Sequence, residues 1–339
     1  MRIHLINLDR SEDRLAEFRA ANAHLTDVER FPAIDGTKID ASEFISAGVL
    51  TKEILEWYTP GVLGSALSHI SLWDRAIATD EAVTVCEDDA VLNLHFENVA
   101  PRVLEMLPAD WDIVFWGHNC GAHLLVEPVT GAFQTIAISD REEMQKGLPA
   151  FQRRSFAAQP LRLVQMFGLV CYSIFGKGAA LLRRRCLPLR EMQVYCRVLG
   201  RELPNLGLDH VTIAHYADLQ AFVSFPPLAL CPNDKSRSLL RSTRMIPTTE
   251  ADQIKPMIEQ RHGGIAIHAR SVPVSGRLED GTSFDAVVHV FDLHGFPSPA
   301  RAYGWLAVGE RPGTRRLFTA LQVPPVTSPE IAVRLALKG

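Results

Sequence analysis

Three consecutive acidic residues directly after a strand-like segment constrain this chain more than any other feature. Residues 83–86 (VTVC) are β-branched or apolar, and Glu87, Asp88 and Asp89 follow before apolar sequence resumes. Adjacent carboxylates repel one another, and burying them without partners is costly. We therefore expect either a solvated acidic turn or a cation among them. At the carboxyl end of a buried strand, where open α/β sheets place their ligands, such acids suit Mg²⁺ or Mn²⁺ carrying a phosphate-bearing substrate.

The composition is that of an ordinary globular protein and argues against several other classes. Of the 339 residues, 47% are hydrophobic and 22% are charged, which allows one large domain or one large and one small domain. The net charge of −4 gives no support for nucleic-acid binding. No stretch approaches the roughly 18–20 apolar residues of a membrane span, so any membrane contact would be peripheral.

Two further features favour a cytoplasmic protein. The N-terminus, MRIHLINLDR, runs directly into a strand-like pattern and lacks the regions of a signal peptide. The six cysteines are scattered without a CxxC pair, and several lie in apolar runs. Reduced thiols in the cytoplasm are therefore expected.

The first half of the chain alternates strand-like and helix-like patterns. Strands are expected at 3–7, 29–36, 83–86 and 111–117. Helices are expected after Ser11, along 63–77 and at 96–107. This alternation predicts an α/β fold with a mixed, mainly parallel sheet and flanking helices.

The pattern weakens between residues 118 and 166, where polar residues predict a long loop or lid. Order returns with a strand-like run at 167–175 and a helix-like run at 176–182. Residues 221–230 resemble an edge strand, because Pro226 and Pro227 cannot donate to a ladder of hydrogen bonds.

The character of the chain changes after residue 245. Four segments resemble strands and are separated by Gly- and Pro-containing turns: 284–291, 302–308, 316–321 and 330–337. We therefore predict an α/β domain over residues 1–244 and a small β-rich accessory domain, a sandwich or barrel, over 245–339.

Four motifs in a fixed order resemble glycosyltransferase family 25, which includes bacterial lipooligosaccharide galactosyltransferases and collagen galactosyltransferases. They are INLDRSEDR (6–14), RFPAIDG (30–36), GVLGSALSHISLWDRAI (61–77) and VCEDDA (85–90). A fifth segment, GLVCYSIFGKGAALL (168–182), is similar to the family's strand-then-helix element. The resemblance covers roughly residues 1–240.

The resemblance implies a GT-A-like nucleotide-sugar fold and a divalent metal, Mn²⁺ or Mg²⁺, held by the acidic run. It also implies inverting transfer of a hexose, most often galactose from UDP-galactose, to a glycan or lipooligosaccharide acceptor. Asp88 and Asp89 are the expected metal ligands, with Glu87 as a third candidate. Phe175 stands where the family tends to have Ser or Arg, so the resemblance does not define the acceptor.

The donor nucleotide is expected to contact residues that follow the first strand. The resemblance places nucleotide recognition at Asn7 and Arg10. Arg14 comes four residues after Arg10, on the same face of a helix if the helix has begun, and its guanidinium could bind phosphate in a bidentate manner. The alternative for Arg14 is a surface ion pair with a neighbouring acid.

Three more residues are candidates for donor binding. Asp35 could accept a hydrogen bond from uracil or ribose, although an Asp-Gly pair is also a common turn. A helix that begins near Gly64 would offer unpaired backbone N–H groups to an anion. His69 could contact phosphate or sugar, or it could be a core histidine with its hydrogen bonds satisfied.

Inverting transfer needs a general base near the acceptor hydroxyl. Asp209 is our candidate because it follows a glycine at the family's downstream acidic position; the alternative is an N-cap for residues 210–217. His210 or His215 could complete the metal shell. Lys235 and Arg237 could touch donor phosphate or lie on a solvated basic loop.

Three functions remain open from the sequence. The first is a glycosyltransferase. The second is a sugar nucleotidyltransferase, although no Gly-rich phosphate loop with Lys or Arg follows the first strand. The third is a nucleotide-sugar or glycan-binding module without turnover.

Overall fold

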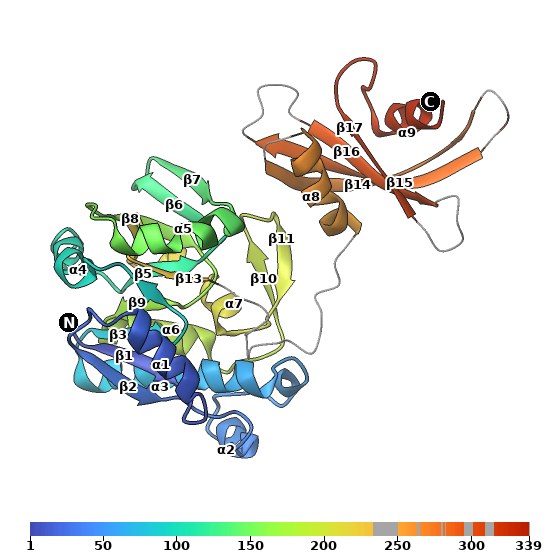
Figure 1. Ribbon diagram of the computed structural model, residues 1–339. Coiled ribbons are helices and arrows are strands. Elements are labelled where there is room, and N and C mark those ends of the chain that lie inside the picture. The colour runs from blue at the N-terminus through green and yellow to red at the C-terminus, as the bar shows by residue number, and fades with distance from the viewer. Residues whose placement is uncertain are drawn as a thin grey trace. The chain divides into compact units, whose positions relative to one another are not determined.

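The computed structural model describes residues 1–232, 250–262, 265–278, 281, 283–294, 301–308 and 315–338. The chain forms two compact units, Met1–Arg244 and Met245–Gly339, which run from blue to yellow and from orange to red in Figure 1. No helix in the described ranges is long and apolar enough to cross a membrane.

A mixed sheet of eleven strands forms the centre of the first unit. Nine strands follow the order β2-β1-β3-β9-β5-β12-β8-β6-β7, and β13 pairs with β4 and β5 beside that path. The pairs β1–β2, β1–β3, β5–β12 and β5–β13 are parallel. The strands are β1 (Ile3–Asn7), β2 (Val28–Pro32), β3 (Val83–Glu87), β4 (Val91–Leu92), β5 (Ile113–Asn119), β6 (His123–Val129), β7 (Phe133–Ile138), β8 (Gln159–Gln165), β9 (Cys171–Ile174), β12 (Ala221–Phe225) and β13 (Ala229–Cys231).

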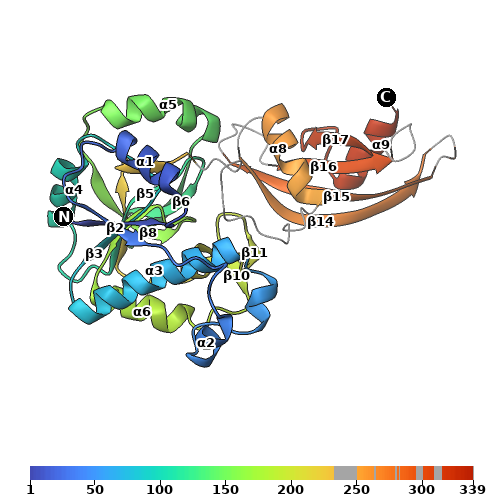
Figure 2. The same ribbon diagram turned by 60° about the horizontal axis from the view of Figure 1, so that its bottom comes forward.

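Helices cover both faces of this sheet, as Figure 2 shows. The long helix α3 (Pro60–Thr79) and α6 (Gly176–Cys186) pack on one face through one large apolar cluster. On the other face, α1 (Glu12–Ala21) and α4 (Phe96–Glu105) contribute to a second cluster. The predicted GT-A-like α/β class is confirmed, because strands and helices alternate around one mixed sheet.

The parallel register of three strands brings the predicted site residues to one edge. Ile6 of β1 lies opposite Glu87 of β3, and Asn7 lies opposite Pro32 of β2. Helix α3 begins at the same edge: Pro60 occupies its first turn, and the Thr59 side chain accepts a hydrogen bond from the Val62 N–H. The carboxyl ends of β1 and β3 therefore meet the N-terminus of α3.

The prediction of a long loop or lid at 118–166 is wrong. The segment contains β6, β7 and β8, which form the far side of the sheet, and helix α5 (Arg141–Arg153), capped by the Asp140 side chain. Strand β7 lies at the sheet edge, and its first three residues are exposed. Its polar face therefore obscured the strand pattern in the sequence.

The prediction of an edge strand at 221–230 is also wrong. Strand β12 lies between β5 and β8, so it is an interior strand. Pro226 and Pro227 fall between β12 and β13, where the chain leaves the ladder. Prolines there remove no hydrogen bond from the sheet, which explains how they fit next to a central strand.

The remaining elements of the first unit are short. They are α2 (Ala41–Ser46), the 3₁₀ turns η1 (Glu53–Glu56) and η2 (Tyr216–Asp218), helix α7 (Leu208–Thr212), and a two-stranded hairpin of β10 (Gln193–Cys196) and β11 (Arg201–Pro204).

The second unit contains one antiparallel sheet in the order β14-β15-β16-β17 and two helices. Its elements are α8 (Glu250–His262), β14 (Ile265–Arg277), β15 (Ser283–His294), β16 (Arg301–Val308), β17 (Arg315–Leu321) and α9 (Pro329–Lys338). The strand expected at 330–337 is wrong, because this segment is α9. Pro329 opens the helix, Ser328 accepts a hydrogen bond from the Ile331 N–H, and Arg334 pairs with Glu330 one turn earlier.

Candidate active site

A cleft at the carboxyl ends of β1 and β3 gathers most of the residues that the sequence singled out. Its walls come from the end of β1, the loop after β2, the first turns of α3 and the acidic run after β3. The predicted residues that line it are Asn7, Arg10, Arg14, Asp35, Glu87, Asp88 and Asp89. The volume of the cleft is about 100 Å³. These residues come from three of the four motifs, and Gly61 and Ser65 of the fourth motif also line the cleft.

The Asn7 side chain connects three segments around this cleft by hydrogen bonds. Its side chain is buried, and its amide nitrogen donates to the Ser11 carbonyl (3.1 Å) and to Asp88 Oδ2 (2.7 Å). Its amide oxygen accepts from Arg30 Nε at 3.0 Å, and Arg30 also bonds Asp9 at 2.5 Å. Because this amide is fully engaged, Asn7 positions Asp88 instead of offering a free amide to a nucleotide.

Arg14 is the main partner of the acidic run. Its guanidinium donates to Asp88 and lies 3.3 Å from Asp89 Oδ2. The side chains of Arg14 and Asp88 are only 19% and 11% exposed. Burial alone would lower the pKa of Arg14, but the charges of Asp88 and Asp89 outweigh it and raise that pKa. Arg14 therefore neutralises the acidic run in this structure. Its partners Asp88 and Asp89 are more than 70 residues away, so this is not the surface pair with a neighbouring acid that was the alternative from the sequence.

Asp89 is the most accessible acid of the run, with 44% of its side chain exposed. Desolvation by the surrounding walls and repulsion from Glu87 nevertheless raise the pKa of Asp89 to about 6. A carboxyl that is open to the cleft and disfavoured as a bare anion is suited to a positively charged ligand.

Arg10 and Asp35 form a second ion pair in the lining of the cleft. The Arg10 guanidinium pairs with Asp35 Oδ2, and Asp35 Oδ1 accepts hydrogen bonds from the backbone N–H and hydroxyl of Thr37. Asp35 thus serves as a turn residue, as the Asp-Gly pair indicated, and still faces the cleft. A ligand that reaches Asp35 has to displace Arg10.

Helix α3 begins earlier than the sequence suggested, so the prediction that it begins near Gly64 is wrong. Its first turn starts at Pro60, and Pro60, Gly61 and Ser65 line the cleft. Gly64 has a packing role: a Cβ atom there would lie 2.3 Å from the Ile34 carbonyl oxygen. The missing side chain lets the loop after β2 lie directly on the helix.

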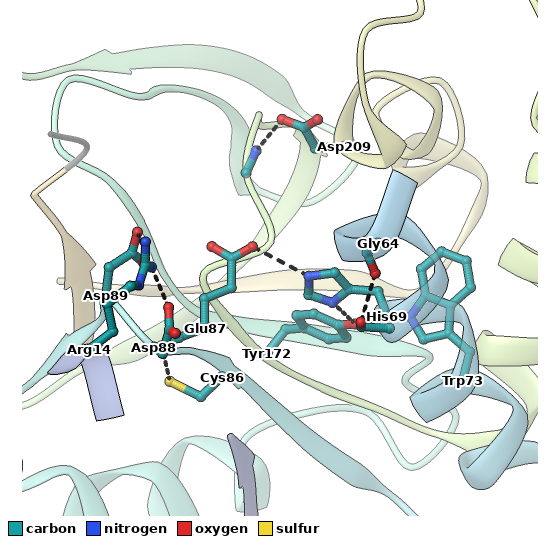
Figure 3. A network of polar contacts seen from close by, with 12 residues as sticks. Arg14, Gly64, His69, Trp73, Cys86, Glu87, Asp88, Asp89, Tyr172 and Asp209 are labelled. Carbon is teal, nitrogen blue, oxygen red and sulfur yellow. Dashed lines mark hydrogen bonds and ion pairs between the residues drawn. The ribbon is translucent and has the colours of Figure 1, made fainter. Parts of the chain in front are cut away.

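His69 reaches the cleft only through Glu87. It is 1% exposed, its Nδ1 lies 3.0 Å from the Tyr172 hydroxyl, and its Nε2 lies 3.3 Å from Glu87 Oε1. The Trp73 indole N–H donates to the same Tyr172 oxygen at 3.0 Å. Since indole only donates and a carboxylate only accepts, Tyr172 donates to His69 Nδ1 and His69 Nε2–H donates to Glu87. Figure 3 shows this chain of donors ending at Glu87.

Asp209 lies in the first turn of α7, with Gly207 in the N-cap position. Its Oδ2 accepts a hydrogen bond from the Gly168 backbone N–H at 3.2 Å. Figure 3 shows Asp209 in the same view as Glu87. Gly168 has φ +95°, a conformation that favours glycine. Asp209 does not line the cleft around the acidic run. It is held beside that cleft by the segment between β8 and β9.

The acids could supply one or two ligands to a metal, but they do not form a site with three or more side-chain ligands. Within the described ranges, no three or more His, Cys, Asp or Glu side chains are grouped around one point as a metal site. Glu87 turns to His69, while Asp88 and Asp89 turn to Arg14 (Figure 3). Mg²⁺ is often held by one or two carboxylates together with water and substrate phosphates. Asp88 and Asp89 fit that smaller ligand set once Arg14 moves aside.

The remaining candidate residues lie away from the cleft or outside the described residues. The His210 ring packs on Phe167, and its Nδ1 lies 2.9 Å from the Pro204 carbonyl oxygen. His215 precedes η2, and neither histidine lines the cleft. Lys235 and Arg237 lie outside the described residues. Sequence reasoning missed Arg30 and Tyr172, whose roles depend on partners more than 20 residues away.

Comparison with known proteins gives the context of this cleft. A sequence model of glycosyltransferase family 25, described as an LPS biosynthesis protein, matches residues 1–185, just over half of the chain. The chain belongs to glycosyltransferase family 25. The matched range contains every motif of the cleft. Asp209, the β10–β11 hairpin and the second unit lie beyond it.

Several curated relatives of this family 25 chain carry related names. A "Glycosyltransferase 25 family member" of Aedes aegypti is 30% identical over 130 residues, which are 34% of this chain and 21% of that protein. The human "Inactive glycosyltransferase 25 family member 3" is 28% identical over 183 residues, covering 47% of this chain and 29% of that protein. The bovine "Probable inactive glycosyltransferase 25 family member 3" is 26% identical over 215 residues, 58% of this chain and 31% of that protein. The aligned parts thus span about a fifth to a third of these relatives.

Proposed function

We propose that this family 25 protein is a metal-dependent, inverting glycosyltransferase. It would move a hexose, with galactose as the leading candidate, from a UDP-sugar to a lipooligosaccharide or another glycan. One observation carries the proposal: four carboxylates, two arginines and a helix N-terminus share one cleft at the carboxyl ends of β1 and β3. A nucleotide diphosphate linked to a sugar carries charges that suit this set.

The donor diphosphate would meet the first turn of α3 and the guanidinium groups of Arg10 and Arg14. Backbone N–H groups at a helix N-terminus and arginine forks both favour phosphate. Arg10 is paired with Asp35, and Arg14 with Asp88 and Asp89, so phosphate would have to displace these contacts to reach the guanidinium groups. Both arginines are then released from carboxylates at the moment when phosphate oxygens arrive.

A divalent cation held by Asp88 and Asp89, with Glu87 as a third candidate, would neutralise the charge that develops on the departing diphosphate. The protein's own residues prepare those ligands. Asn7 fixes Asp88 through a 2.7 Å hydrogen bond, and His69 fixes Glu87. Rigid ligands of this kind lower the cost of reorganising the site.

Asp209 is the proposed general base. It would take the proton from the acceptor hydroxyl as that oxygen attacks the anomeric carbon from the face opposite the diphosphate. The bond from the anomeric carbon to the diphosphate breaks in the same step, so the configuration inverts. The Gly168 N–H holds one carboxylate oxygen of Asp209 and so orients the other.

Donor turnover tests this proposal. The purified protein should convert UDP-galactose to UDP faster with Mn²⁺ than with EDTA, as measured by chromatography. A panel of UDP-glucose, GDP-mannose and CMP-sialic acid would define the nucleotide. No metal-dependent turnover of any donor would refute the enzyme assignment.

A second candidate is a nucleotide-sugar-binding protein without turnover, because the names of two relatives include the word inactive. It would show a higher melting temperature with UDP and Mn²⁺ but no release of UDP from UDP-sugars.

A further inference from the structure

A second cavity, of about 230 Å³, lies in the first unit and belongs to none of the motifs discussed above. Its walls come from the end of β5, the start of β6, the end of β8 and the turn of the β10–β11 hairpin. Asn119, His123, Gln165, Phe167, Val198 and Leu199 are among its lining residues. The volume lies below the roughly 300–1,000 Å³ of pockets for drug-sized ligands, so it suits a single sugar ring or a group of that size.

The lining is uncharged and of mixed polarity. It contains no Asp, Glu, Lys or Arg, and His123 is its only histidine. Transfer of an ionised group into such a cavity has no counter-charge to offset the loss of water. Phe167 and Leu199 offer an apolar wall, while amide groups offer hydrogen bonds. A neutral hexose has this same combination of an apolar C–H face and a rim of hydroxyl groups.

The walls are fixed before any ligand arrives. Gln165 donates from Nε2 to the Tyr195 carbonyl (2.9 Å) and accepts at Oε1 from the Arg197 N–H (2.7 Å), which ties the hairpin to β8. Phe167 packs edge-on against His210, with ring centroids 5.1 Å apart. No hydrogen bond joins the Asn119 side-chain amide to another residue in the part of the chain that the structure describes. This half-buried amide is therefore available to a ligand hydroxyl.

One short segment connects this cavity with both Asp209 and the acidic run. Phe167 lines the cavity, the Gly168 N–H bonds Asp209, and the Val170 carbonyl accepts from the Glu87 N–H at 2.9 Å. The Asn119 amide also packs against Gly168, where an added Cβ would lie 2.6 Å from Asn119 Nδ2. The cavity thus adjoins the proposed base through Gly168, while the donor cleft adjoins the same segment through Glu87.

We infer that this cavity, here called the hairpin cavity, binds a neutral hexose residue of the acceptor glycan. The inference rests on the proposed function and adds the class of acceptor to it. Uncharged walls select a neutral sugar over a phosphorylated or acidic one. The link through Gly168 places that sugar next to Asp209.

Hexoside binding in the absence of donor and metal tests the inference separately from turnover. Saturation-transfer NMR would use the full chain with the methyl glycosides of glucose, galactose, mannose and N-acetylglucosamine. At least one should receive saturation, and glucose 6-phosphate should bind at least about tenfold more weakly than the best of them. The variant Leu199→Trp, which fills the cavity from the hairpin turn, should lose the signal. Tyr195→Trp, on the same hairpin but 55% exposed and outside the cavity, should keep it.

A second filling variant, Ala122→Tyr, covers the case that the first misfolds, since Ala122 lines the cavity from the turn between β5 and β6. Melting curves would confirm that each variant is folded. Absence of binding by all four glycosides, or equal binding by the folded filling variants, would overturn the inference. Metal-dependent donor turnover by the same wild-type sample would show that the proposed function stands even if the cavity assignment fails.

Discussion

Replacing Arg14 by glutamine tests whether positive charge holds the acidic run in place. Removing one partner of a buried ion pair costs about 3–5 kcal/mol, whereas an exposed pair contributes about 0–1 kcal/mol. The Arg14–Asp88 pair lies between these limits, with side chains 19% and 11% exposed. We therefore expect Arg14→Gln to lower the free energy of unfolding by about 2 kcal/mol in EDTA. For a unit of this size, that loss lowers the melting temperature by ~4–8 °C.

Manganese should reverse the effect more strongly in the variant than in the wild type. In the wild type a cation has to displace the guanidinium that bonds Asp88 and lies 3.3 Å from Asp89. In Arg14→Gln that competition is absent, so Mn²⁺ should raise the melting temperature of the variant by more degrees. Differential scanning calorimetry with EDTA and with increasing Mn²⁺ measures both quantities.

Arg10→Gln is the matched control for this experiment. Its pair with Asp35 is 45% exposed on the arginine side, so its loss should cost less than about 1 kcal/mol. It should leave the response to Mn²⁺ unchanged. The reasoning is refuted if Arg14→Gln is as stable as the wild type in EDTA, or if Mn²⁺ raises both melting temperatures equally.

Three further predictions address other residues of the site. Because folding raises the pKa of Asp89 from 3.8 to about 6, Asp89 favours the metal-free fold only while protonated, and this contribution is lost as the pH rises through 6. Asp89→Asn should therefore match the wild type at pH 4 and melt higher at pH 7.5 in EDTA; a lower melting temperature at pH 7.5 would contradict this. Gly64→Ala puts a Cβ 2.3 Å from the Ile34 carbonyl oxygen. Such overpacking should lower the free energy of unfolding, measured in urea, by about 1–3 kcal/mol. An unchanged urea midpoint would show that the loop after β2 moves to make room. Asp209→Asn should still bind UDP with Mn²⁺ but lose transfer to an acceptor, and near-normal transfer would place the base elsewhere.

The sequence predicts the elements around the cleft well because their signals are local. The buried run of β1, the strand before the acidic residues and the amphipathic helix α3 each show their period directly in the residues. Parallel pairing then has to bring Asn7 and Glu87 to one edge. The clustering of Arg10, Arg14 and the acids follows from those elements.

The roles of individual side chains could not be predicted in the same way, because they depend on distant partners. His69 reads equally well as a ligand contact or a core residue until Tyr172 and Glu87 are placed on either side of it. Asn7 reads as a nucleotide contact until Arg30 and Asp88 are shown to occupy its amide. In both cases the missing information is tertiary.

Elements with weak or ambiguous periodicity account for two of the errors in the fold. Strand β7 is exposed at the sheet edge, so its sequence lacks the apolar alternation of a buried strand. The apolar residues of α9 fit either period, and the cap at Ser328 decides for a helix. The hairpin cavity joins segments from Asn119 to Leu199, and no motif marks it.

The most direct test of the central claim is the affinity for UDP with and without Mn²⁺, measured by calorimetric titration at pH 7.5. If a cation joins the acidic run to the diphosphate, Mn²⁺ should tighten UDP binding at least about tenfold in the wild type, equivalent to ~1.4 kcal/mol. Asp89→Asn should abolish that gain. Equal UDP affinity in Mn²⁺ and in EDTA would contradict the account.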